Sequence, residues 1–303
     1  MSSPELPSPE LPSNDPVVPL KITLGQEYPP PPPIVIELPK TEIDLLDVIF
    51  ILLALAVISI FWGVIAAVIY MAAHHGKPVD AKTMGTNVFF ILPVEFVVYA
   101  AVLGFMAFLA WVRHRRSLLD AVGWNNPDGK LATVAVFTGL GLAFVSSLTS
   151  ILLNRWIPKS LPMSELFKDR PSAFLLAGFA VLVAPLMEEM FFRGVLYPAL
   201  ARSISSVISM LFRGDVYLVL ARSTGSVISI LITSVAFTAL HASQLGYSWA
   251  ALLPIFIVGT TLTIMRAVKK SLAACVLIHM TYNFLLMVVA FIGSHGFRDM
   301  HGI

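Results

Sequence analysis

The sequence has few charged residues, one cysteine and no run of basic residues, and each shortage excludes a class of protein. Only 13% of its 303 residues are charged, whereas a soluble domain of this size carries about 25%. The single cysteine, Cys275, cannot form an internal disulfide or a thiolate metal cluster. The net charge of +2, without a basic tract, argues against a nucleic-acid-binding protein.

The sequence contains long runs of apolar residues. Hydrophobic residues make up 57% of the chain, and the mean hydropathy is +0.84. Seven runs approach the length of about 20 residues that a helix needs to cross a bilayer. They cover approximately residues 48–71, 88–112, 131–153, 172–198, 225–245, 248–265 and 272–293. We therefore predict an all-α, polytopic transmembrane helix bundle with about seven spans and a range of six to eight. Residues 203–220 are the candidate for an eighth span.

The N-terminal 46 residues differ in composition from the rest, since they contain 12 of the 21 prolines, including the run Pro29 to Pro33. Proline at this density removes backbone donors and favours extended polyproline structure. We predict a disordered tail over residues 1–46 and a transmembrane domain over 47–303. The tail is either a solvated tether or a ligand for proline-recognising domains, and the sequence selects no partner.

The distribution of positive charge predicts the orientation. With the N-terminus inside, the inner segments hold 13 of the 20 lysines and arginines, and the outer segments hold 7. Cytoplasmic loops of membrane proteins are enriched in these residues. We therefore predict a multi-pass integral membrane protein with a cytoplasmic N-terminus, and we expect it in the cell (plasma) membrane of a prokaryote.

One internal repeat is present. Residues 190–209 (MFFRGVLYPALARSISSVIS) align without gaps to residues 210–229 (MLFRGDVYLVLARSTGSVIS), with 13 of 20 positions identical. A unit of this length occurring twice is not a solenoid, so we interpret it as a local tandem duplication. Because the second copy lacks the two glutamates that precede the first, we predict that it is structural.

The interval that contains the repeat is compatible with a helical hairpin. If residues 189–240 form a symmetric hairpin, its tip falls near Arg213, Gly214 and Asp215. Each arm is then about 39 Å long at 1.5 Å per residue. Such a hairpin would protrude into the cytoplasm, and the duplication would supply the extra length.

Acidic residues inside apolar spans are the first candidates for chemistry, because a charged group in a membrane usually faces a cavity or a partner. Only Glu95, Glu188 and Glu189 lie inside predicted spans. Glu189 and Arg193 are spaced i, i+4, which places them on one helix face as an ion pair. The adjacent Glu188 points about 100° away and is left for another role. Glu95 follows Pro93, and we interpret it as a satisfied carboxyl near a kink.

Two histidines lie convincingly within spans. His279 and Asn283 are spaced i, i+4, so one face of the last span presents an imidazole and an amide. His241 follows Phe237 at the same spacing near the outer end of its span. Each polar residue alone could simply connect helices by hydrogen bonds.

Together, these residues form three motifs in order on successive predicted spans. The motifs are Glu188-Glu189-x-x-x-Arg193, Phe237-x-x-x-His241 and His279-x-x-x-Asn283. They resemble the three motifs of the CPBP (Abi) family, which comprises the type II CAAX prenyl endopeptidases and their bacterial relatives. The resemblance covers residues 172–290. The 52 residues between Glu188 and His241 exceed the expected interval by about the duplicated unit.

The resemblance implies an intramembrane endopeptidase with a cavity open to the cytoplasmic side. By this resemblance, Glu188 and His241 hold and deprotonate the attacking water, and His279 and Asn283 donate hydrogen bonds to the tetrahedral oxyanion. The expected substrate is a protein or peptide at the bilayer, which in eukaryotic members of the family is a prenylated C-terminus.

Glu189 and Arg193 are expected to support the site from behind by fixing the helix face that aims Glu188.

The cofactor is left open between two alternatives. We expect water activation without a cofactor. Alternatively, Glu188, His241 and His279 bind zinc or another divalent metal as a two-histidine, one-carboxylate site with an open position. The sequence has no H-E-x-x-H motif, which is typical of many zinc peptidases.

Two functions of other classes remain as alternatives. A non-proteolytic immunity or regulatory protein of the membrane would keep the same motif residues for packing. A transporter would use the intramembrane carboxyls as a path for protons or ions. The transporter is disfavoured because the sequence contains no visible inverted repeat of broken helices.

Overall fold

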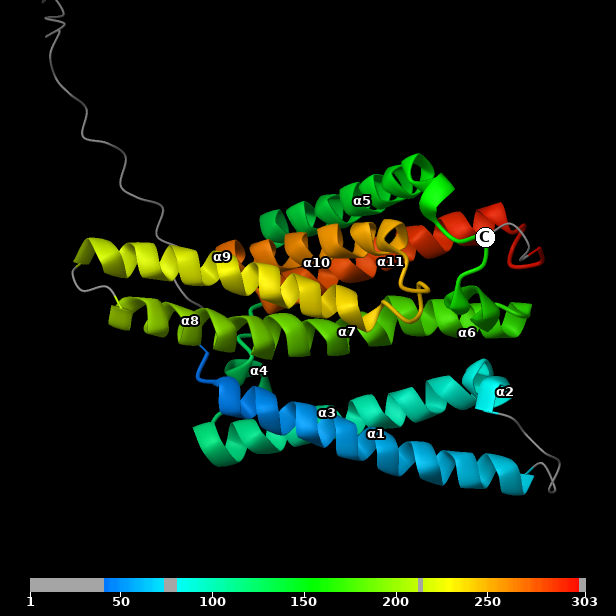
Figure 1. Ribbon diagram of the computed structural model, residues 1–303, viewed down its shortest axis with the longest axis horizontal. Helices are drawn as coiled ribbons and strands as arrows, with labels where there is room; N and C mark the ends of the chain where they lie inside the picture. The colour runs from blue at the N-terminus through cyan, green and yellow to red at the C-terminus, as the bar shows by residue number, and fades with distance from the viewer. Residues whose placement is uncertain (1–40, 74–80, 212–214, 300–303) are drawn as a thin grey trace, which may run out of the picture. The chain divides into compact units, whose positions relative to one another are not determined.

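The protein is described here by a computed structural model over residues 41–73, 81–211 and 215–299 (Figure 1). All regular elements in these ranges are helices, and seven stretches are long and apolar enough to cross a membrane. The predicted all-α, polytopic transmembrane bundle is therefore confirmed. The predicted tail lies outside the described residues as far as residue 40. The seven stretches are α1 (Leu45–Ala73), α3 (Val88–His114), α5 (Gly129–Leu152), the run Arg170–Leu211, Val219–Leu240 within α9 (Asp215–Leu240), α10 (Trp249–Lys269) and α11 (Leu272–Gly293).

Polar side chains define where several helices begin. In each case the side chain of the capping residue accepts a hydrogen bond from a backbone N–H of the first turn, which otherwise has no partner. These residues are Asn87, Ser117, Asp128, Asp169, Ser248 and Ser271. Two short helices, α2 (Ala81–Gly85) and α4 (Leu118–Ala121), occupy connections between the long ones.

The fourth span lies between two groups of helices. On one side, α1 packs against α3, and their buried apolar residues form a core with Met187 and Met190 of the fourth span. On the other side, α5 packs against α11, and α10 packs against α9 and α11. Glu189 and Arg193 of the fourth span are fully buried between these groups.

The fourth span is longer than the sequence predicts, since it runs over 42 residues instead of ending near residue 198. At 1.5 Å per residue it is about 63 Å long, about twice the thickness of a bilayer core. Its parts are α6 (Arg170–Gly178), a π-helical segment (Phe179–Val183), α7 (Ala184–Glu189), a second π-helical segment (Met190–Leu196) and α8 (Tyr197–Leu211).

The hairpin predicted around the duplication is present. Helix α8 packs along α9, and Figure 1 shows the two arms side by side. The tip predicted at Arg213 and Gly214 lies outside the described residues, because α8 ends at Leu211 and α9 begins at Asp215. An eighth span over 203–220 is wrong, since that interval contains the change of direction between the two arms.

The arms approach each other closely at equivalent positions of the repeat. Ser205 in the first copy corresponds to Gly225 in the second, and both are buried. A Cβ atom added to Gly225 would lie 2.2 Å from Ser205 Oγ and 2.8 Å from the Ser205 amide nitrogen. Only glycine allows this approach, as at other helix contacts between small residues in membranes.

Candidate active site

The two adjacent glutamates lie between the π-helical segments of the fourth span. A π-helical segment shifts each backbone hydrogen bond by one residue, and such segments are frequent at functional sites. The proline at position 185 gives a local reason, because its nitrogen has no hydrogen to donate. The glutamates therefore lie in α7, a short stretch of regular α-helix that has a π-helical segment at each end.

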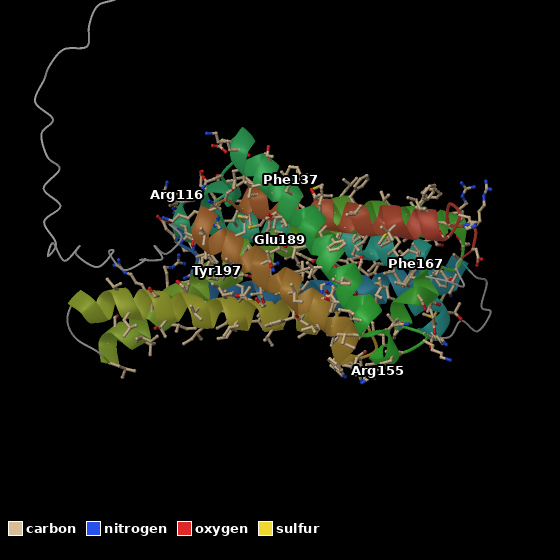
Figure 2. All side chains as sticks on the ribbon, turned by 90° about the horizontal axis from the view of Figure 1, so that it is seen from above. Arg116, Phe137, Arg155, Phe167, Glu189 and Tyr197 are labelled. Atoms are coloured by element: carbon tan, nitrogen blue, oxygen red, sulfur yellow. The ribbon has the colours of Figure 1, made fainter. Side chains whose placement is uncertain are left out.

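Glu189 and Arg193 form the predicted ion pair, fully buried. Arg193 Nη1 donates to Glu189 Oε1 at 2.8 Å, and both side chains are 0% exposed. The remaining contacts of the guanidinium tie the pair to α10: Nη2 donates to the carbonyl oxygen of Gly259 at 2.8 Å, and Nε donates to Thr263 Oγ1 at 3.3 Å. Figure 2 shows Glu189 between the two ends of the bundle, which carry Arg116 and Arg155.

His279 of α11 contacts both glutamates through its two ring nitrogens. Its Nδ1 lies 2.9 Å from Glu189 Oε1, and its Nε2 lies 3.9 Å from Glu188 Oε2. The first distance is a hydrogen bond, and it fixes the orientation of the imidazole. Glu189 thus binds both Arg193 and His279, a larger role than the sequence predicts for it.

Glu188 differs from Glu189 in exposure and in partners, since Glu189 is fully buried and its Oε1 binds Arg193 and His279, although Oε2 of Glu189 also lacks a hydrogen-bond partner among the described residues. The Glu188 side chain is 18% exposed, yet its Oε2 atom is buried and has no hydrogen-bond partner among the described residues. A buried oxygen without a donor is costly unless a ligand, water or proton occupies the site. The residue predicted to activate water is therefore the one of the two glutamates that combines an unsatisfied oxygen with a partly exposed side chain.

Asn283 binds a backbone carbonyl that Pro185 leaves free. In the first π-helical segment the amide of Ala184 donates to the carbonyl oxygen of Phe179. By the same pattern, the N–H of residue 185 would donate to the carbonyl oxygen of Ala180, but residue 185 is a proline and has no N–H. Asn283 Nδ2 donates to that carbonyl oxygen at 2.7 Å. One of the two N–H groups of the amide remains for another acceptor.

His241, the second residue of the Phe237-x-x-x-His241 motif, lies against Phe237. It lies one residue beyond the end of α9, so the predicted span over 225–245 ends earlier than expected. Its Nδ1 is 3.0 Å from the carbonyl oxygen of Phe237. The Phe237 ring lies 4.9 Å from the His241 ring and 5.8 Å from the His279 ring, measured between centroids. Phe237 therefore connects the two histidines.

Phe237 also contacts the buried arginine. The Arg193 guanidinium lies 4.5 Å from the ring centroid, a geometry in which the ring attracts the cation. Gly259 makes room for this ring, since an added Cβ would lie 3.0 Å from Phe237 Cδ1. The first residue of the second motif is thus a packing residue at the centre of the site.

The metal alternative needs three ligands at one point. Of the three candidates, Glu188 and His279 approach each other, whereas the side chain of His241 contacts Phe237. Among the residues that the structure describes, no group of three or more histidine, cysteine, aspartate or glutamate side chains is placed to hold a metal ion. The cofactor stays a prediction in both forms.

Glu95 lies on α3, which packs against the first part of the fourth span. As expected, it has a partner, because Tyr99 Oη donates to Glu95 Oε1 at 2.9 Å. However, Glu95 and Tyr99 also lie close enough to Glu188 to interact with it electrostatically. The Tyr99 ring packs 5.8 Å from that of Phe179, in the first π-helical segment. In the sequence, the i, i+4 spacing between Glu95 and Tyr99 could have indicated that the two side chains form a pair.

A comparison with protein families gave a match over the segment that contains the motif residues. Residues 170–285 match the family described as Type II CAAX prenyl endopeptidase Rce1-like. The segment is similar to these endopeptidases. The resemblance predicted from the three motifs is therefore confirmed, and the Rce1-like segment contains every motif residue. Comparisons with curated proteins and with solved structures gave no match.

Proposed function

We propose that the protein is an intramembrane endopeptidase that hydrolyses a peptide bond near the membrane surface. The observation that carries this proposal is the unsatisfied carboxylate oxygen of Glu188, 3.9 Å from His279 Nε2, within the Rce1-like segment. Such an oxygen is suited to bind and deprotonate a water molecule.

In the proposed reaction, Glu188 removes a proton from water as the water oxygen attacks the carbonyl carbon of the substrate. His241 helps to hold the water from the side of α9. The carbonyl π bond breaks, and the negative charge moves to the carbonyl oxygen. The proton then passes from Glu188 to the amide nitrogen, and the oxyanion re-forms the carbonyl bond as the C–N bond breaks, so that an amine and a carboxylic acid leave.

His279 and Asn283 stabilise the oxyanion in this proposal. Nδ1 of His279 is bound by Glu189, which fixes the direction of the ring so that Nε2 faces Glu188, and in this proposal Nε2–H donates to the oxyanion. Asn283 contributes its remaining N–H. Removing one donor of this kind from an enzyme typically costs about 100- to 1,000-fold in turnover.

The substrate that we propose is a protein or peptide segment at the bilayer, with or without a lipid group. The site lies inside a bundle whose helices cross the membrane, so a substrate must reach it from the lipid or from one face. A farnesylated C-terminal peptide is the first probe, because the matching family acts on prenylated proteins by its description.

The test compares protein termini by mass spectrometry in cells that express the wild type, Glu188→Gln or Glu165→Gln at equal levels. Glu165 is the control, since its carboxylate is 47% exposed and contacts Lys82 away from the site. We expect cut ends with the wild type and with the control variant, and none with Glu188→Gln. Equal cut ends in all three samples contradict the proposal.

The metal alternative has its own measurement on the purified protein. Cleavage of the probe peptide should survive prolonged treatment with a chelator if Glu188 alone activates water. Loss of cleavage on chelation, with recovery on adding zinc, instead supports a metal held by Glu188, His241 and His279. If a folded wild type cleaves neither the probe nor any cellular protein, the non-proteolytic alternative is favoured.

A further inference from the structure

A second cavity lies away from the motif residues, with a volume of about 540 Å³. Its lining includes Thr41, which precedes α1, and residues from the connections between α3 and α5 and between α10 and α11. Four spans begin or end around it: α3 ends at His114, α5 begins at Gly129, α10 ends at Lys269 and α11 begins at Leu272. Since apolar spans end where the headgroups begin, the cavity lies at headgroup depth.

A buried arginine forms the inner wall of this cavity. Arg266 is 1% exposed, and it donates hydrogen bonds to the carbonyl oxygens of Arg193, Gly123, Lys270 and Val122. Among the described residues it takes part in no salt bridge. The carbonyls orient the guanidinium but leave its positive charge uncompensated.

The local backbone is adapted to this arginine. Gly123 has φ +67°, and an added Cβ would lie 2.6 Å from Arg266 Nη2. The carbonyl of Arg193 is available because, in the second π-helical segment, the amide of Tyr197 donates to Phe192 and residue 198 is a proline. The position of the guanidinium is therefore built from several elements, which favours a specific role for it.

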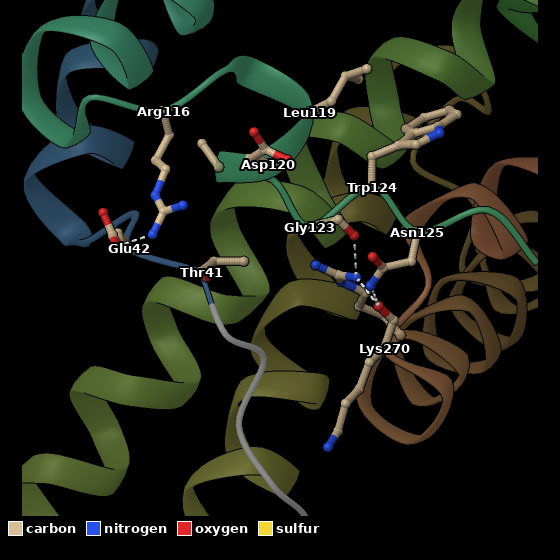
Figure 3. Close-up of a pocket in the computed structure, with 11 residues that line it drawn as sticks. Thr41, Glu42, Arg116, Leu119, Asp120, Gly123, Trp124, Asn125 and Lys270 are labelled. Atoms are coloured by element: carbon tan, nitrogen blue, oxygen red, sulfur yellow. Dashed lines mark hydrogen bonds and ion pairs between the residues drawn. The ribbon is translucent and has the colours of Figure 1, made fainter.

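The other charged groups of the cavity leave it attractive to an anion. Arg116 lies 3.5 Å from Glu42 (Figure 3), and both side chains are more than half exposed. Exposed pairs of this kind contribute little, so Arg116 can turn to a stronger acceptor. Asp120 already accepts a hydrogen bond from the Ser117 hydroxyl at 2.7 Å. Lys270 adds a further cation to the lining, so the cavity holds three cationic and two anionic side chains.

We propose that this cavity binds the phosphate group of an anionic lipid headgroup. The buried charge of Arg266 supplies the long-range attraction, because a charge removed from water is costly until an opposite charge compensates it. Arg116 supplies a planar fork that matches phosphate oxygens. Trp124 lines the same cavity (Figure 3), at the depth where tryptophan is enriched in membrane proteins. This proposal does not rest on the proposed peptidase activity.

The test measures thermal unfolding of the full chain in an uncharged detergent, with added phosphatidylglycerol, phosphatidylcholine or inorganic phosphate. We expect phosphatidylglycerol to raise the midpoint by about 5 °C at saturation and phosphatidylcholine to leave it unchanged. An equal rise with both lipids overturns the proposal. A rise with inorganic phosphate at low millimolar concentration, and none with lipid, also overturns it by assigning the site to the free ion.

Substitutions test whether the stabilisation by phosphatidylglycerol arises at this cavity. The double substitution Arg116→Gln with Lys270→Gln should reduce the apparent lipid affinity at least tenfold. The matched control is Lys130→Gln with Lys269→Gln, which removes two exposed cations near the same end of the bundle that do not line the cavity. Equal loss of affinity in both pairs means attraction to general surface charge and overturns the assignment. Arg266 is left unchanged, because its hydrogen bonds also hold the fold.

Discussion

Asn283 donates a hydrogen bond of 2.7 Å to the carbonyl oxygen of Ala180, which the proline at position 185 leaves without a backbone donor. The same relationship recurs 13 residues later, where Arg266 Nε donates at 3.0 Å to Arg193, five residues before Pro198. In both places a proline and a π-helical segment leave one carbonyl exposed, and a side chain from another helix binds it. The distorted span is thereby attached to α11 and to α10.

The first prediction concerns Pro185. In Pro185→Ala the new N–H competes with Asn283 for the carbonyl of Ala180, so the amide is no longer fixed in direction. We expect turnover of the probe peptide to fall about tenfold or more, since precise placement of an oxyanion donor is worth about 100- to 1,000-fold. Combining Pro185→Ala with Asn283→Ala should add little to the loss from Asn283→Ala alone, because both changes act on one group. Additive losses contradict this connection.

Neutralising the two adjacent glutamates should have different effects on the stability of the fold. Glu189→Gln leaves Arg193 and His279 buried without their carboxylate, and breaking a buried ion pair costs about 3–5 kcal/mol. Glu188→Gln replaces a carboxylate whose buried oxygen has no partner, so we expect stability within about 1 kcal/mol of the wild type.

The measurement for this pair is thermal unfolding in detergent together with peptide cleavage. Glu188→Gln should abolish cleavage without changing the unfolding midpoint much. Glu189→Gln should lower the unfolding midpoint. If Glu188→Gln is the more destabilised of the two, Glu188 is a packing residue and the catalytic proposal is contradicted.

The close approach of the hairpin arms gives a third prediction. Gly225→Ala places a methyl group against Ser205, and overpacking of this kind costs about 1–3 kcal/mol. Gly104→Ala is the matched control, because nothing lies within 4 Å of a Cβ added at that helical glycine. There alanine should be neutral or stabilising by up to about 1 kcal/mol. Equal unfolding midpoints for the two variants argue against the close contact.

The second copy of the repeat should be dispensable for chemistry. Residues 210–229 contain none of the motif residues, and the hairpin that they extend leads away from α7 (Figure 1). We expect a chain lacking these 20 residues to keep cleavage of the probe peptide within about tenfold, at reduced stability. Complete loss of folded protein, measured by size-exclusion chromatography in detergent, shows instead that the arm is required for the fold.

Hydropathy and i, i+4 spacing predicted the number of spans and the Glu189–Arg193 pair, because both follow from helix geometry alone. The distorted turns did not follow, since a proline in an apolar run predicts a kink without showing which carbonyl it frees. The packing of Tyr99, the partner of Glu95, against Phe179 also depends on how α3 lies against the fourth span, which no local pattern contains.

The duplication in the hairpin has an evolutionary consequence. Inserting a whole unit at the far end of two antiparallel arms lengthens the interval between the first two motifs without separating the residues that must stay together. Those residues are held by contacts with α10 and α11, not by the length of the chain that joins them. Insertions and deletions can therefore accumulate here under weak selection, and a homology search that demands a fixed interval between the motifs would overlook such chains.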